Sequence, residues 1–123
     1  MKDARNILLM SSGLDSFCAW HLLGSDIDPV YFQLGHRYEQ KETETLDLLE
    51  TAVPGLIVRR ETRLYLGDLE RPDGFIPLRN MLLVAAATLD FDGPCRVHIG
   101  ALRGEASRDK SVAFFRQMSK ALT

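Results

Sequence analysis

Short apolar runs and amphipathic segments alternate along the chain, and polar turns separate them. Residues 7–10 form an apolar run that is too short for a helix and is typical of a parallel strand covered on both faces. Small residues follow at 11–13. Side chains then recur at the three-, four-, seven- and eight-residue offsets of one helix face, namely Leu14, Phe17, Cys18, His21 and Leu22. We therefore expect a strand, a tight turn and a helix that buries this face, and we also expect Trp20 to pack.

The same unit repeats through the rest of the chain. The predicted elements are a strand at 30–34, a helix at 39–52, a strand at 56–58, a helix at 77–87, a strand at 96–101 and a helix from 111. Leu46, Leu49 and Val53 are spaced to bury one side of the helix at 39–52. The helix at 77–87 is apolar almost all round, which predicts burial on several sides. Turn residues within 59–75 predict a long irregular loop.

This alternation predicts an α/β fold. Strands joined to helices through short breaks form βαβ units, so we expect a doubly wound, Rossmann-like parallel sheet of about four or five strands with helices on both faces. A chain of 123 residues is expected to form a single domain, 1–123. Polar residues gather after three of the strands, at 11–16, 35–38 and 103–111. Because parallel strands share one carboxyl edge, the sequence predicts a single polar crevice built from distant loops.

Composition limits the partners. Fifteen Lys and Arg against 17 Asp and Glu give a formal charge of -2, which argues against nonspecific nucleic-acid binding. No apolar run approaches the length of a membrane span, and the N-terminus lacks a signal-peptide pattern, so a cytoplasmic location is expected. Cys18 and Cys95 form no metal-binding pair; no zinc or disulfide framework is expected, and Cys18 is expected in the core.

The turn at 11–16 is the first candidate site. A helix N-terminus presents unpaired N–H groups and partial positive charge, so a small-residue turn that leads into one suits a phosphate. Ser11 and Ser16 add hydroxyl donors. Asp15 would repel a phosphate, so its expected role is to cap the helix or to hold a metal ion. A capped turn without a ligand explains the same pattern.

Residues 11–16, Ser11-Ser12-Gly13-Leu14-Asp15-Ser16, resemble the Ser-Gly-Gly-x-Asp-Ser pyrophosphate loop of the PP-loop ATP pyrophosphatases, with Ser12 in place of the first glycine. Further stretches resemble the 7-cyano-7-deazaguanine synthases of that superfamily. Gly35-His36-Arg37-Tyr38 is similar to their Gly-Gln-Arg-His, and Ile76-Pro77-Leu78-Arg79-Asn80 to their Val-Pro-Gly-Arg-Asn. Ile99-Gly100-Ala101, Asp109-Lys110-Ser111 and Phe114-Phe115 are similar to their Gly-x-x-x-x-Asp…Tyr-Pro-Asp-x-x-x-x-Phe segment. The family's C-terminal four-cysteine zinc site has no counterpart in this sequence.

The resemblance implies an adenine nucleotide alpha hydrolase-like fold and an ATP-dependent ligase. ATP would adenylate 7-carboxy-7-deazaguanine, ammonia would convert the adenylate to an amide, and a second ATP would dehydrate the amide to the nitrile. The implied catalytic residues are Asp15, Arg37, Arg79 and Asp109, with Mg²⁺ on Asp15. The implied ATP-binding residues are Met10, Ser11, Ser12, Gly13, Leu14, Asp15, Ser16, Gly35, Asn80, Gly100 and Lys110. A homodimer is also implied.

Simpler interpretations stay open for each of these side chains. Arg79 and Asn80 fit a solvated helix end, residues 36–38 a plain loop, Asp109 a helix cap and Lys110 a solvated lysine. A lone His36 makes a poor case for a general acid or base. Two other functions are consistent with the pattern. One is a different PP-loop reaction, either tRNA modification or another amidation, and the other is a non-catalytic nucleotide-binding subunit.

Overall fold

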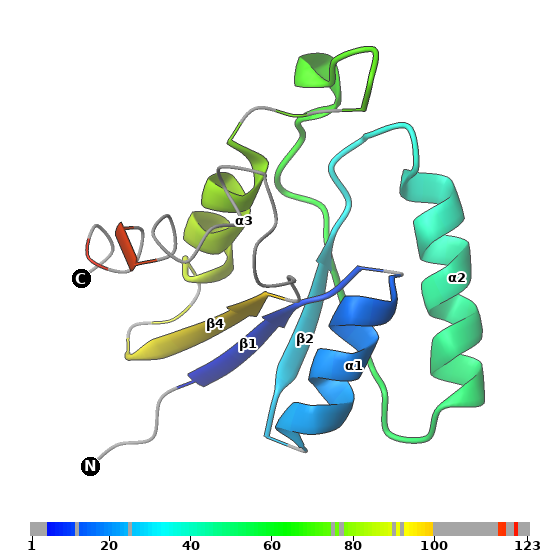
Figure 1. Cartoon of the computed structure of the whole chain (residues 1–123), viewed down its shortest axis with the longest axis vertical. Helices are drawn as coiled ribbons and strands as arrows, with labels where there is room; N and C mark the ends of the chain where they lie inside the picture. Colours follow the sequence, from blue (N-terminus) through cyan, green and yellow to red (C-terminus); the bar gives the residue numbers. More distant parts are fainter. Residues whose placement is uncertain are drawn as a thin grey trace.

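Four parallel strands form one sheet in the order β3-β2-β1-β4. The computed structural model describes residues 5–11, 13–24, 26–74, 76, 78–89, 91, 93–99, 116, 117 and 120. Its elements are β1 (Arg5–Leu9), α1 (Leu14–Leu23), β2 (Asp28–Phe32), α2 (Glu39–Ala52), β3 (Arg59–Glu61), the 3₁₀ turn η1 (Gly67–Leu69), α3 (Arg79–Ala87) and β4 (Cys95–Ile99). The fold is the expected doubly wound α/β arrangement (Figure 1).

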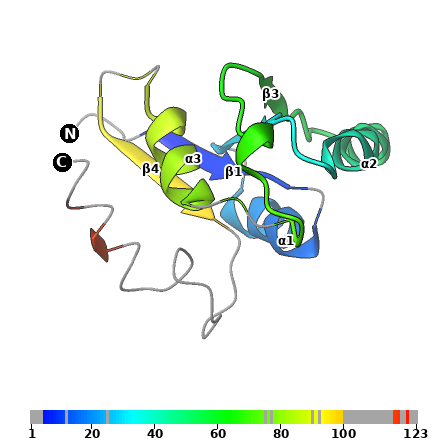
Figure 2. The same cartoon turned by 90° about the horizontal axis from the view of Figure 1, so that it is seen from above.

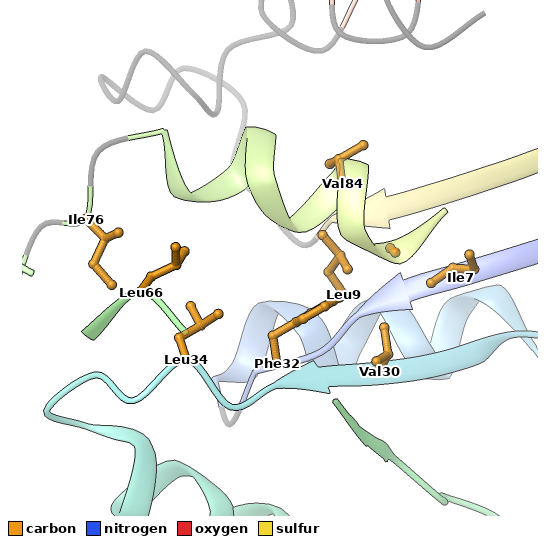
Figure 3. Close-up of a cluster of buried hydrophobic side chains, with 9 residues drawn as sticks. Ile7, Leu9, Val30, Phe32, Leu34, Leu66, Ile76 and Val84 are labelled. Carbon is orange, nitrogen blue, oxygen red and sulfur yellow. The ribbon is translucent and has the colours of Figure 1, made fainter. Parts of the chain in front are cut away.

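Helices cover both faces of the sheet. Figures 1 and 2 show α1 and α2 on one face and α3 on the other. The alternation of side chains along β1 explains this arrangement, because Leu8 packs toward the α1–α2 layer while Ile7 and Leu9 pack toward α3. Val84 of α3 belongs to the same buried cluster as Ile7 and Leu9 (Figure 3). A strand buried on both sides accounts for the uninterrupted apolar run at 7–10.

The predicted buried face of α1 is wrong for four of its five residues, whereas Phe17 of that face and Trp20 pack as expected. Leu14 is 74% and Leu22 83% exposed, and Cys18 and His21 are exposed as well. Ser16 is buried instead, and Phe17, Ala19 and Trp20 pack against the sheet, with the Phe17 and Trp20 rings 6.0 Å apart. Most residues of α1 are apolar, so their spacing does not select a face. The rotation of the helix follows from the position of Ser16 beside the turn, which brings its hydroxyl back to Ser11.

Element boundaries differ where backbone pairing overrides side-chain pattern. The helix at Glu39–Ala52 has the predicted bounds, and Leu46 is fully buried on its inner side. However, β2 begins at Asp28, which pairs with Ile7 of β1. The third strand is Arg59–Glu61, which the sequence assigned to a loop. Leu56 and Val58 of the predicted strand are buried, but the residues that pair with β2 are Arg59–Glu61. The predicted last helix, from Ser111, lies largely outside the described residues.

The helix α3 begins at Arg79 and buries one side completely. Asn80, Val84 and Ala87 are its buried residues, whereas its other apolar side chains are only partly buried. Every residue of α3 is at least partly buried, and these apolar side chains pack against the core, which agrees with the predicted burial on several sides. No helix in the part of the chain that the structure describes is both long and apolar enough to span a membrane.

Candidate functional site

A cavity of about 280 Å³ lies at the carboxyl ends of β1, β2 and β4, beside the N-terminal end of α3. Strand order reverses at this edge, because β2 and β4 lie on opposite sides of β1. Polar side chains from five elements or turns line it: Ser11, Ser16, Tyr31, His36, Glu42, Arg79 and Asn80. Apolar residues form the rest of the wall, from Leu9 and Met10 of the first strand region to Ile99 of β4. Segments far apart in the sequence thus share one concave site.

Hydrogen bonds between two serines organise the turn at 11–16. The Ser11 backbone N–H donates to Ser16 Oγ at 3.0 Å, and Gly13 N–H donates to Ser11 Oγ at 3.1 Å. Ser16 Oγ in turn donates to the Ser11 carbonyl at 3.0 Å. These bonds bring both hydroxyls to the cavity wall. The amides of Ser11 and Gly13 and the Ser16 hydroxyl proton already have partners, so an anion at this turn would be bound by the Ser11 hydroxyl and by the N–H groups of the first turn of α1.

Asp15 does not cap α1 as expected. Gly13 is the N-cap residue, and no described side chain makes a capping bond there. Asp15 is exposed in the first turn, beside the cavity wall rather than in it. Within the described residues, no group of three or more His, Cys, Asp or Glu side chains gathers as a metal site. Asp15 therefore offers one solvent-facing carboxylate next to the turn.

Arg79 and Asn80 reach the cavity from the start of α3, the place that the sequence predicted for them. Asn80 is 4% exposed, whereas Arg79 is partly buried. The Arg79 guanidinium forms no ion pair with the carboxylates of the described segments. Leu78, just before it, has φ 56° in the left-handed region, which is unfavourable for a leucine. In the Val-Pro-Gly-Arg-Asn motif that residues 76–80 resemble, the position of Leu78 is a glycine, the residue that a positive φ favours.

A partly buried network of Tyr31, Glu42 and His36 forms another part of the cavity wall. Glu42 Oε1 accepts a hydrogen bond from Tyr31 Oη at 2.7 Å and lies 2.6 Å from His36 Nε2. Burial raises the pKa of Tyr31 well above its ordinary value, and the Glu42 carboxylate raises it further, so the phenol stays protonated and donates. Tyr31 and Glu42 were missed in the sequence. Spacing offered a signal, because Glu42 precedes Leu46 and Leu49 by four and seven residues on the inner side of α2.

Arg37 lies away from the cavity wall. Its Nε donates to Glu70 Oε2 at 3.1 Å, and its Nη2 donates to the Arg71 carbonyl at 2.7 Å. Gly35 also turns outward, with φ 77° and the Tyr65 ring packed against it. Of the sequence-predicted site, the cavity wall thus contains Met10, Ser11, Ser16, Arg79 and Asn80. Gly13, Leu14, Asp15, Gly35 and Arg37 are described but do not line it. Ser12, Gly100, Asp109 and Lys110 lie outside the described residues.

Comparison of the chain with protein-family models, curated proteins and solved structures finds no match. Fold and site together define a class: a doubly wound α/β protein with a polar cavity at the carboxyl edge of its parallel sheet.

Proposed function

We propose that this chain binds ATP at the carboxyl edge of the sheet and uses it to activate a carboxylate, releasing AMP and pyrophosphate. The observation that carries the proposal is the convergence of Ser11, Ser16 and the Arg79 guanidinium on one cavity beside the N-terminus of α1. Hydroxyls, helix amides and an arginine are the groups that proteins use to bind phosphates. Their placement at a strand-order reversal supports a nucleotide ligand.

Each group has a separate role in the proposed reaction. The Ser11 hydroxyl and the first-turn amides of α1, which lie beside the cavity, bind the phosphates that leave as pyrophosphate. Arg79 offsets the negative charge that develops at the phosphorus under attack by the carboxylate oxygen. Proteins commonly hold Mg²⁺ with one or two carboxylates together with the phosphates of the substrate, and Asp15 could supply such a carboxylate. The ion would neutralise the leaving pyrophosphate. Asn80 orients the bound substrates.

The proposed substrate follows from the resemblance to the 7-cyano-7-deazaguanine synthases. It is 7-carboxy-7-deazaguanine, which is converted through an amide to the nitrile with ammonia as the nitrogen source and two ATP molecules. We place this reaction in the cytoplasm, where all three small molecules are available without export. The protein would contribute positioning and charge stabilisation rather than a covalent intermediate.

The test is to incubate the full chain with Mg²⁺, ATP, ammonium and 7-carboxy-7-deazaguanine and to measure AMP and pyrophosphate. AMP is expected in proportion to the acid supplied, and none is expected without it. Arg79→Gln should lower the rate by about 10²-fold, the loss that follows removal of a charge-stabilising donor. Lys41→Gln removes a positive charge from an exposed position of α2 and should leave the rate unchanged. ATP binding without AMP formation would contradict the proposal and favour a non-catalytic nucleotide-binding module.

A further inference from the structure

The imidazole of His36 has one nitrogen paired and one unpaired. Its Nε2 lies 2.6 Å from Glu42 Oε1, an oxygen that also accepts from Tyr31. A carboxylate can only accept hydrogen bonds, so Nε2 carries the proton and Nδ1 of the neutral ring carries the lone pair. Nδ1 is buried and has no hydrogen-bond partner, and it is the one such side-chain atom among the described residues. A buried acceptor without a donor is unfavourable unless a ligand supplies the donor.

Charged and polar groups from three elements surround His36. Glu42 of α2 contacts the ring directly, and Glu39 lies near it through a 2.7 Å bond to the Gly35 N–H. Tyr31 of β2 is neutral and reinforces the orientation of Glu42. Arg79 of α3 lines the same cavity and carries the opposing charge. His36 is one of the residues that line the cavity. A carboxylate that holds one imidazole nitrogen and leaves the other unpaired is the arrangement of an oriented general base.

We propose that His36 is the general base of the amide-forming step and that Glu42, held by Tyr31, positions it. This inference rests on the proposed function. Ammonia attacks the carbonyl carbon of the acyl adenylate, a carbon–nitrogen bond forms, and the bond from that carbon to the phosphate oxygen breaks. AMP leaves with the electron pair. The surplus proton of the nitrogen passes to His36 Nδ1, and the imidazolium is stabilised by Glu42 until the proton returns to water.

His36→Gln is the matched variant for the test. A glutamine amide can still donate to Glu42 in place of Nε2, but it cannot take up a proton. Glutamine is also the residue that the resembling motif has at this position, so the variant measures what histidine adds. Two assays on the full chain separate the steps. ATP–pyrophosphate exchange with 7-carboxy-7-deazaguanine and no ammonia reports adenylation alone, and amide formation with ammonium chloride reports both steps.

We expect His36→Gln to keep the exchange rate within about twofold and to lower amide formation by about 10²-fold, the size of a general-base contribution. The fraction of ammonium present as ammonia depends on pH equally for both proteins, so it cancels in the ratio of variant to wild-type amide rates. This ratio should approach one at low pH, where a protonated histidine can no longer accept a proton. Glu42→Gln should also keep the exchange rate within about twofold and lower amide formation, because the imidazole loses the carboxylate that orients it.

Unchanged amide formation in His36→Gln would overturn the inference, and so would an equal loss of exchange and amide formation, which would indicate a role in binding. A wild-type chain without exchange activity would instead refute the proposed function. The two failures are therefore distinguishable.

Discussion

Arg37 and Glu70 are joined by two hydrogen bonds although 33 residues separate them in sequence. The Arg37 backbone N–H donates to Glu70 Oε1 at 2.9 Å, and its Nε donates to Oε2 at 3.1 Å. The Glu70 side chain is only 9% exposed. The Glu70 carboxylate thus connects the turn after β2 to the residues that follow η1, and it holds the Arg37 side chain against them.

Glu70→Ala should lower the free energy of unfolding by about 1 to 2 kcal/mol, because it removes the acceptor of the Arg37 backbone N–H and of its Nε, while Nη2 keeps its bond to the Arg71 carbonyl. Urea denaturation measures the loss. Asp68→Ala changes an exposed acidic residue of the same loop and should alter stability by less than about 0.5 kcal/mol. Equal effects in the two variants would show that the connection contributes nothing.

Gly35 is restricted both by its conformation and by its neighbour. Its φ is 77°, and a Cβ there would clash with the ring of Tyr65. Gly55 has φ 86° but nothing within 4 Å of such a Cβ, so Gly55→Ala should cost only the conformational penalty, about 1 to 2 kcal/mol. Gly35→Ala should cost about 1 to 3 kcal/mol more, as overpacking does.

Adding Tyr65→Ala to Gly35→Ala should recover most of this difference in thermal or urea unfolding. Identical losses in the two single glycine variants would exclude a role for the Tyr65 ring.

Leu78 has a left-handed backbone at the entrance to α3, and its side chain is 57% exposed. Leu78→Gly removes the clash of Cβ with the backbone, worth about 1 to 2 kcal/mol, and adds the smaller entropic cost of glycine. A net stabilisation of about 0.5 to 1 kcal/mol is expected. Leu89→Gly, at an exposed leucine outside the left-handed region, should be destabilising by about 0.5 kcal/mol. A loss of stability in Leu78→Gly would contradict the assignment of strain.

Glu61 links stability to acidic pH. Hydrogen bonds from the Arg63 side chain and backbone, aided by the charges of Arg63 and Arg59, lower the pKa of Glu61 to about 2. Because the folded pKa lies below the ordinary value of 4.5, the stabilisation is complete above pH 4.5 and is lost as the pH falls toward 2. Glu61→Gln should cost about 1 to 3 kcal/mol at pH 7, since Arg63 is largely exposed, and almost nothing near pH 2.

Urea denaturation between pH 7 and pH 2 measures this convergence. Glu44→Gln, at an exposed position of α2, should show a small difference that does not depend on pH. A pH-independent cost in Glu61→Gln would show that its carboxylate charge is not the cause.

Prediction succeeded where local rules leave few choices. The helix Glu39–Ala52 combines helix-forming residues with a Pro54-Gly55 stop, and its bounds are as expected. It failed at α1, because a helix that is apolar on most sides has no preferred face in the sequence, and the Ser11–Ser16 bonds select one. At the candidate site, Arg79 and Asn80 line the cavity, whereas Arg37 does not. Loop residues have no periodicity from which to read a partner such as Glu70.

By itself, the sequence determined the order of strands and helices, the parallel sheet and the edge at which polar turns meet, because these depend on period and on short connections. Only the tertiary structure decided which side chains share the cavity. Tyr31 lies in an apolar strand and Glu42 in a mostly polar helix, and neither reads as a site residue alone. They meet His36 because α2 packs on the same face of the sheet that Tyr31 occupies, and a contact across that interface has no counterpart in local sequence spacing.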